Sequence, residues 1–456
     1  MRIFWRIPIL VFALVALVGC AGGKPIRWGH FHGNLASQGV QQVDSGFALS
    51  PRWISKPYRI TSSSPVIGSD FQDREIIYIG TTDGLLLALR SEDGSEKWTL
   101  ALADAGSETH IISSPSVSDQ RNIYVISNRK TGEDRYRSTL HKIDQFRNQK
   151  WSYSFPDNGF ATGSPKVMTT LKEALIFVYL SVGTVDGLQG ELFVLRDEGN
   201  QVQLVDRKPL GTCRYDLPES AAGSGDLVRF YGDTWNLVSK WPPVSDQSGV
   251  VLPDRFIDPT VAVVTGRAKP LIAIADNLCS VGVFEWDGTG LSVIWRQQHR
   301  FEKHSSVAVS PNGLMVFGRQ DGKVQAYDVE TGVEMWDYEA TQPVFSTPVI
   351  VEDRYVFVVS KDHIQVLNVS DGTLARGDNS TGMLTLHGVT HSSPAVTANR
   401  VYVSTFEMLT VTYDLKTRAH DTNFHGNGLS SPAIGRDGAV YVVAEDGRIR
   451  KYAGTE

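Results

Sequence analysis

Residues 326–336 have the sequence AYDVETGVEMW, and residues 88–98 have the sequence ALRSEDGSEKW. In both stretches an acidic turn with a glycine separates two strand-like runs, and a tryptophan follows four residues after the glycine. Glycine adopts positive φ without steric cost, so the pattern predicts a tight turn between two β-strands. A tryptophan ring buries about 150–250 Å², and we therefore expect these rings to pack between neighbouring sheets. The same feature recurs at Trp98, Trp151, Trp295 and Trp336.

A longer repeat surrounds this unit. Each copy opens with a pair of small residues, usually followed by proline, and then runs through four short strands separated by turns. The copies begin at 63–65, 113–115, 163–165, 258–259, 305–307, 346–348, 392–394 and 430–432. All but one of the intervals fall near 40–50 residues, a period that is typical of propeller blades. The interval between the third and fourth copies is about twice as long and contains either an insertion or an extra unit.

The repeat resembles the tryptophan-docking repeat of pyrroloquinoline-quinone (PQQ) type propellers, over most of residues 50–456. A WD40 propeller is the alternative fold, but there the Trp-Asp pair closes the third strand, whereas these tryptophans follow the turn. The last unit lacks its outer strand, and residues 51–55 look like an outer strand without a unit of their own. We therefore predict an all-β, eight-bladed PQQ-like β-propeller over residues 51–456, closed by an N-terminal strand in the last blade so that no sheet edge is left open.

The first residues carry the features of an export signal. Arg2 and Arg6 precede twelve apolar residues at 7–18, too few to cross a bilayer core of about 30 Å but typical of a signal peptide. The residues before Cys20 resemble the lipobox of bacterial lipoproteins, which implies cleavage after residue 19 and lipidation of Cys20. Ala21 then favours the outer membrane. An ordinary secretory signal is the alternative, and residues 20–50 are predicted to form a lipidated tether.

Residues 208–256 are predicted to form a long inter-blade insertion, with a degenerate ninth blade as the alternative. Trp235 and Trp241 lie in it, either as anchors for a protein partner or packed on their own blade. Cys213 and Cys279 are the only cysteines after Cys20. In an oxidising compartment they are a candidate disulfide, and two separate buried thiols are the alternative.

The sequence offers little sign of chemistry. Lys and Arg number 44 against 50 Asp and Glu, with no basic block, which argues against nucleic acid as a partner. No hydrolase, metalloprotease or nucleotide-binding motif occurs. Five histidines gather near the starts of blades, on blades too far apart to share one ion: His110, His304, His387, His391 and His425. We therefore predict no catalytic residue, no metal site and no cofactor.

The signal, the lipobox and the weakly kept repeats together resemble the BamB family of propeller lipoproteins. The resemblance implies a non-enzymatic scaffold at the outer membrane, facing the periplasm. It also implies protein partners in β-barrel assembly, namely the barrel-inserting subunit of the assembly machinery and unfolded outer-membrane proteins. The alternative is a PQQ-dependent dehydrogenase-like enzyme, or another ligand-binding propeller that uses its central channel.

Overall fold

The computed structural model describes residues 28–46, 49–102, 107–132, 135–156, 159–170, 173–184, 187–212, 259–276, 280–299, 304–340, 342–375, 382–386, 388, 390–406, 409–414 and 420–454. Within these residues the chain is built from antiparallel β-strands that form eight sheets, here called blades. No helix among them is long and apolar enough to cross a membrane.

The first four blades follow in chain order. Blade 1 consists of β2 (Val66–Ser69), β3 (Glu75–Gly80), β4 (Leu85–Arg90) and β5 (Glu96–Ala101). Blade 2 consists of β6 (Thr109–His110), β7 (Ser116–Val117), β8 (Ile123–Gly132), β9 (Arg135–Ile143) and β10 (Gln149–Ser154). Blade 3 consists of β11 (Gly159–Phe160), β12 (Lys166–Thr169), β13 (Ala174–Thr184), β14 (Gly187–Asp197) and β15 (Val202–Thr212). Blade 4 consists of β16 (Ala262–Val264), β17 (Leu271–Ala275), β18 (Ser280–Trp286) and β19 (Leu291–Gln298).

The other four blades continue to the C-terminus. Blade 5 consists of β20 (Ala308–Val309), β21 (Leu314–Gly318), β22 (Lys323–Asp328) and β23 (Glu334–Glu339). Blade 6 consists of β24 (Val349–Val351), β25 (Tyr355–Ser360), β26 (His363–Asn368) and β27 (Met383–Thr385). Blade 7 consists of β28 (Ala395–Val396), β29 (Arg400–Ser404), β30 (Leu409–Asp414) and β31 (His420–His425). Blade 8 consists of β32 (Ala433–Ile434), β33 (Val440–Val443), β34 (Ile449–Gly454) and β1 (Leu49–Ile54).

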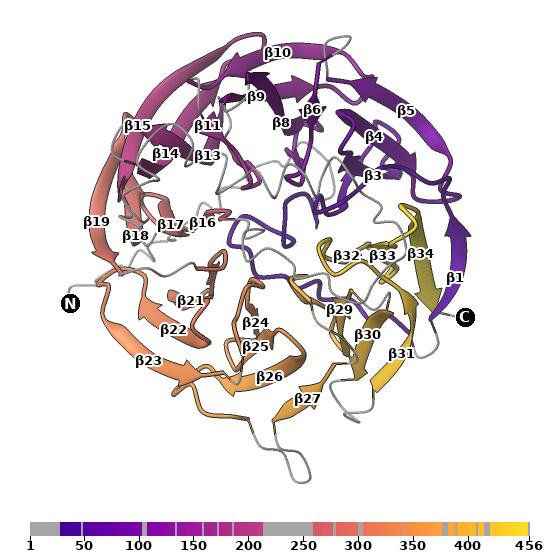
Figure 1. Ribbon diagram of the computed structural model, residues 1–456, viewed down its shortest axis with the longest axis vertical. Helices are drawn as coiled ribbons and strands as arrows, with labels where there is room; N and C mark the ends of the chain where they lie inside the picture. Colours follow the sequence, from indigo (N-terminus) through magenta and orange to yellow (C-terminus); the bar gives the residue numbers. More distant parts are fainter. Residues whose placement is uncertain are drawn as a thin grey trace, which may run out of the picture.

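The blades stand around a common axis, with the innermost strand of each beside that of the next (Figure 1). The ring closes in blade 8, where β1 pairs antiparallel with β34 and Trp53 lies opposite Lys451. The outer strand predicted at residues 51–55 is therefore present as β1, which covers residues 51–54 of it. Because it joins the two ends of the described chain in one sheet, no edge is open between the last blade and the first.

The predicted fold class needs a correction, because the blades are not eight copies of one four-stranded unit. Blades 2 and 3 each have five strands. In blade 2 the innermost position is divided between β6 and β7, which both pair with the ten-residue β8. Blade 3 repeats this arrangement along the eleven-residue β13. The Ser-Pro turn interrupts the innermost strand, and the unusually long partner has room to pair on both sides of it.

Two predicted boundaries also change. Residues 208–212 belong to the outer strand β15, so the insertion starts only after Thr212. The predicted tether, residues 20–50, is wrong for residues 28–46, which pack inside the ring. Trp28 is 2% exposed and forms a β-bridge with Ile67 of blade 1. Val40 forms a parallel bridge with Val396 of blade 7.

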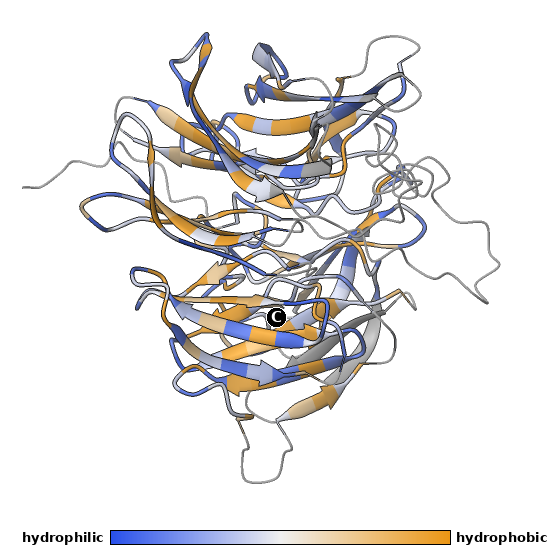
Figure 2. Ribbon diagram, turned by 60° about the vertical axis from the view of Figure 1, so that its left-hand side comes forward, coloured by the Kyte–Doolittle hydropathy of each residue, from blue (hydrophilic) through white to orange (hydrophobic). Residues whose placement is uncertain are grey.

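The hydrophobic core lies between the faces of neighbouring blades. Hydrophobic residues follow the strands and alternate with hydrophilic ones where a face meets solvent (Figure 2). One cluster joins Leu89 of blade 1 to Tyr441 of blade 8, and another joins Tyr124 of blade 2 to Ile176 of blade 3. Each blade therefore buries its two faces against two others, as expected for strands with period-two alternation.

Tryptophans seal five of the blade junctions, and the prediction that they are structural is confirmed. Each ring lies on the outer strand of one blade, and its Nε1–H donates to the next blade. The acceptors are Ser91 O for Trp53, Gln145 O for Trp98, Asp197 Oδ1 for Trp151, Val329 O for Trp295 and Val369 O for Trp336. The turn glycine has a matching role: a Cβ built on Gly332 would lie 2.6 Å from the Trp295 ring.

Candidate functional site

A ring of hydroxyl groups surrounds one end of the central channel, and it explains the small-residue pairs at the blade starts. The backbone N–H of the second residue in one blade donates to the hydroxyl of its equivalent in the next, as from Ser64 to Ser114 Oγ at 2.9 Å. Ser431 N–H closes the ring on Ser64 Oγ. The other bonds of this kind run from Ser114 to Ser164, Ser164 to Thr260, Thr260 to Ser306, Thr347 to Ser393 and Ser393 to Ser431.

Residues 28–46, here called the strap, run around the inside of the ring. The strap binds each of these blades at the residue three positions after the one whose hydroxyl belongs to the ring. The backbone N–H of that residue would lack a partner without the strap. In five blades that N–H donates to a strap carbonyl: Ile67 to Trp28 O, Val117 to Gly29 O, Val263 to Leu35 O, Val309 to Ala36 O and Val396 to Gly39 O, at 2.7–3.1 Å. Figure 1 shows the strap, in indigo, at the centre of the ring.

Blade 3 holds the strap with a side chain. The Lys166 side chain is fully buried, and its Nζ donates to Phe31 O at 2.8 Å and to Asn34 O at 2.7 Å. A buried ammonium group is costly unless it is hydrogen-bonded. The two strap carbonyls therefore stabilise the lysine, and the lysine fixes the strap.

Two histidines of the strap lie beside this lysine, His32 buried and His30 half-buried. Burial, and then the positive charge of Lys166, lower the pKa of His30 to about 3. Burial is also the main reason that the pKa of His32 falls to about 4. His32 lies 2.7 Å from Ser37 O and 2.9 Å from Pro394 O, and a Cβ on Gly39 would collide with its ring at 2.5 Å. The strap is thus packed as tightly as a core element.

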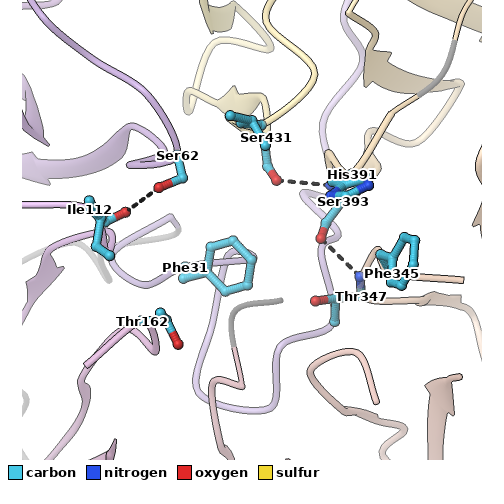
Figure 3. Close-up of a pocket in the computed structure, with 10 residues that line it drawn as sticks. Phe31, Ser62, Ile112, Thr162, Phe345, Thr347, His391, Ser393 and Ser431 are labelled. Carbon is cyan, nitrogen blue, oxygen red and sulfur yellow. Dashed lines mark hydrogen bonds between the residues drawn. The ribbon is translucent and has the colours of Figure 1, made fainter. Parts of the chain in front are cut away.

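A pocket opens at the hydroxyl ring, where Phe31 of the strap reaches the axis (Figure 3). Six blades contribute to its wall, each through the segment before its innermost strand. The lining residues are Phe31, Ser62, Ile112, Thr162, Phe345, Thr347, His391, Ser393, Leu429 and Ser431.

The histidines predicted near the blade starts do not share a site. His304 is buried, its Nδ1 lies 2.8 Å from Asp276 O, and burial lowers its pKa to about 3. His110 is buried beside Thr82 O, and His425 is exposed. Only His391 lines the pocket, and His387 lies outside the described residues. Among the described residues, no group of three or more His, Cys, Asp or Glu is placed to hold a metal ion.

The other predicted site residues cannot be placed in this arrangement. Cys20, Cys213, Trp235, Trp241 and Cys279 all lie outside the described residues. The sequence does not reveal the strap as a functional element, because residues 20–50 are typical of a tether between a lipid anchor and a folded domain. Its sequence, WGHFHGN at residues 28–34, held the available signal: three aromatic or imidazole side chains in a row are unusual for a solvated linker.

Comparisons with known proteins agree with this architecture. A family profile described as "Outer membrane protein assembly factor BamB" matches residues 287–417. The crystal structure of BamB from Moraxella catarrhalis is similar over 91% of this chain and 97% of that chain, with 15% identity and a TM-score of 0.50. A europium-containing methanol dehydrogenase is similar over 94% of this chain and 98% of that chain, with 12% identity and a TM-score of 0.60.

One curated relative matches a shorter stretch. The beta-alanine-activating enzyme of Danio rerio is 29% identical over 122 residues, which is 25% of this chain and 10% of the enzyme. The chain thus spans about a tenth of that enzyme's length. The structural likenesses show the fold alone, at identities this low. The chain is therefore an all-β propeller, and its residues 287–417 are similar to the BamB family profile.

The dehydrogenase-like structures raise the question whether the channel fits PQQ and a metal ion. The strap carbonyls already bind the inner edges of five blades, and Phe31 stands at the axis. The pocket wall is formed by hydroxyls, aliphatic and aromatic side chains and one imidazole, without a carboxylate to hold a divalent cation or a charged side chain to pair with the acidic cofactor. The residues of this pocket therefore do not fit the group.

Proposed function

We propose that this protein is a non-enzymatic scaffold, anchored in the outer membrane and facing the periplasm, that binds partner proteins during assembly of β-barrel outer-membrane proteins. The observation that carries the proposal is the strap. A propeller whose channel is occupied by its own backbone has lost the place where propeller enzymes of this type hold their cofactor. Its rim, faces and loops remain for binding other proteins. The family profile over residues 287–417 supports the same role.

The anchor in this proposal is Cys20, lipidated after cleavage of residues 1–19. Several acyl chains, each contributing about 0.8 kcal/mol per buried methylene, hold a protein firmly at a membrane surface. From Cys20 to Trp28 the chain spans at most about 29 Å, at about 3.6 Å per residue. The ring therefore stays close to the membrane, and the strap fixes where the anchor leaves it.

The partners in this proposal are the barrel-inserting subunit of the assembly machinery and unfolded outer-membrane proteins. Trp235 and Trp241 in the insertion are proposed contacts, and Cys213 and Cys279 are a proposed disulfide. Tryptophan is enriched among residues that dominate binding energy at interfaces. The PQQ-dependent alternative is favoured by no observation of the described residues, because the dehydrogenase likeness extends to the fold alone.

Co-purification tests the proposal. We would isolate the native protein from detergent-solubilised outer membranes and identify the accompanying chains by mass spectrometry. A Cys20→Ala strain and a Trp235→Ala, Trp241→Ala double variant serve as controls. We expect the barrel-inserting subunit to co-purify in stoichiometric amount with the native protein and in reduced amount with the tryptophan double variant. The Cys20→Ala protein itself should be absent from the membrane fraction. Recovery of the propeller alone would refute the scaffold role as a stable complex.

A further inference from the structure

The pocket at the hydroxyl ring contains two buried polar atoms that have no partner. Thr162 is 7% exposed, and neither its Oγ1 nor Nδ1 of His391 has a hydrogen-bond partner among the described residues. Both residues line the pocket, on opposite sides of Phe31 (Figure 3). Leaving a buried polar atom unpaired costs about 1–3 kcal/mol. A ligand that turns one of these atoms toward the pocket and supplies a hydrogen-bonding atom to it would recover that energy.

The apolar residues of the pocket wall favour an aromatic ligand. The Phe345 ring lies 4.7 Å from the His391 ring, centroid to centroid, and Phe406 lies behind the histidine at 5.9 Å. Phe31 forms the floor, and Ile112 and Leu429 add apolar surface. Aromatic rings at such distances attract a further ring in an offset or edge-to-face arrangement.

Charge is the second criterion. No charged side chain lines the pocket, and burial lowers the pKa of His391 to about 4, so its imidazole is neutral at neutral pH. An ionised ligand would leave water without meeting an opposite charge, which is strongly unfavourable. The pocket therefore favours an uncharged ligand.

We propose that this pocket binds an uncharged aromatic ring that carries one hydrogen-bonding group, and that its occupant is the phenol of a tyrosine side chain on a partner protein. The ring packs against Phe31 and Phe345, while the hydroxyl donates to His391 Nδ1 or accepts from Thr162 Oγ1–H. That the occupant comes from a protein rests on the proposed scaffold function. The ligand chemistry rests on the pocket alone.

The experiment uses p-cresol, the side-chain analogue of tyrosine, titrated into the purified mature protein by calorimetry or by NMR shifts. We expect saturable binding of p-cresol and weaker binding of toluene. We expect 4-methylbenzoate, which has the same ring with a charge, not to bind. The variants Thr162→Val and His391→Phe should each weaken p-cresol about 5-fold or more, as the loss of a buried hydrogen bond implies. Thr99→Val, on the half-buried outer strand of blade 1 and away from the pocket, is the matched control and should leave p-cresol binding unchanged.

The inference is overturned if p-cresol does not saturate, if 4-methylbenzoate binds as tightly, or if the folded Thr162→Val and His391→Phe variants bind p-cresol like the wild type. Circular dichroism of both variants shows whether they fold, and either one alone suffices for the comparison. Failure here is separable from failure of the scaffold role. Binding of p-cresol without co-purifying proteins refutes the scaffold and leaves the ligand class, whereas co-purification without p-cresol binding refutes the pocket alone.

Discussion

Trp336 and Asp206 occupy the same position in the outer strands of two different blades, and they close their junctions in different ways. Each pairs with the middle of the third strand immediately after a bulge: Trp336 lies opposite Ala326 and Asp206 opposite Val194. Trp336 buries its ring against blade 6 and donates to Val369 O at 2.8 Å. Asp206 instead accepts the Leu291 N–H of blade 4 at 2.6 Å.

The junction between blades 3 and 4 has a hydrophobic cluster like the others, in which Phe177 packs with Ile272 and Trp286, and polar contacts take the place of the docked tryptophan at its outer edge. Ser280 Oγ donates to Leu210 O at 2.7 Å, and Arg296 donates to Pro209 O at 3.2 Å. An exposed or half-buried hydrogen bond contributes about 0.5–1.5 kcal/mol, less than burial of an indole ring. One register position can therefore be sealed by a ring or by a carboxylate. At this position the tryptophan should contribute more to stability than the carboxylate does.

Acid should lower the free energy of unfolding more than any of the substitutions below. It should do so by protonating histidines of the unfolded chain, whereas the tryptophan rings do not titrate. Burial lowers the pKa of five histidines to about 3 or 4: His30, His32, His141, His304 and His391. Below their ordinary value of about 6.5 the unfolded state binds more protons, so stability falls as the pH drops toward 4, by up to about 1.4 kcal/mol per pH unit for each histidine. Chemical denaturation at pH 7, 6 and 5 measures this decline. An unchanged free energy of unfolding across that range would contradict it.

Trp336→Ala tests the strong kind of junction. Removing the buried ring should lower the free energy of unfolding by about 3–5 kcal/mol, as for other core tryptophans. Trp336→Phe keeps an aromatic ring but loses the bond to Val369 O, and it should cost clearly less. Urea denaturation of the three proteins gives the comparison. If Trp336→Ala lost less than about 1 kcal/mol, the ring would not be sealing the junction.

Gly332→Ala perturbs another tryptophan junction from the side opposite the ring, the one that Trp295 seals between blades 4 and 5. The new Cβ would meet the Trp295 ring at 2.6 Å, and the backbone φ of +69° is itself unfavourable for alanine. We expect a loss of about 2–4 kcal/mol, the sum of overpacking and left-handed strain. Gly266→Ala is the matched control, because its φ is +82° but nothing lies within 4 Å; it should lose only about 1 kcal/mol. Equal losses in thermal or urea unfolding would show that the tryptophan contact contributes nothing.

Asp206→Ala should have the smallest effect of the series, although it removes the residue that stands in the tryptophan position. One hydrogen bond to the Leu291 N–H is lost, which corresponds to about 1–2 kcal/mol. Asp206→Asn keeps an acceptor oxygen and should recover about half. Hydrogen exchange at the Leu291 amide reads out this contact directly. A loss as large as that of Trp336→Ala would remove the distinction between the two kinds of junction.

Much of this architecture is predictable from sequence because its determinants are local and repeated. The turn glycine and the tryptophan four residues later set the docking contact, and the small-residue pairs mark the hydroxyl ring. The strap is different, because its partners are set by closure of the ring. His32 reaches Pro394 O across 362 residues of sequence, and nothing near either residue signals the contact. The pocket is likewise assembled from six blades, so no stretch of sequence contains it.

The proposed scaffold function requires that the strap leaves no room for PQQ in the channel. Titration of PQQ with calcium into the purified mature protein, followed by calorimetry and by the cofactor's absorbance, tests this requirement. We predict no saturable binding up to high micromolar PQQ, with the strap still protected from hydrogen exchange at its backbone amides. Stoichiometric PQQ binding accompanied by release of the strap amides would contradict the account and place the protein among the ligand-binding propellers.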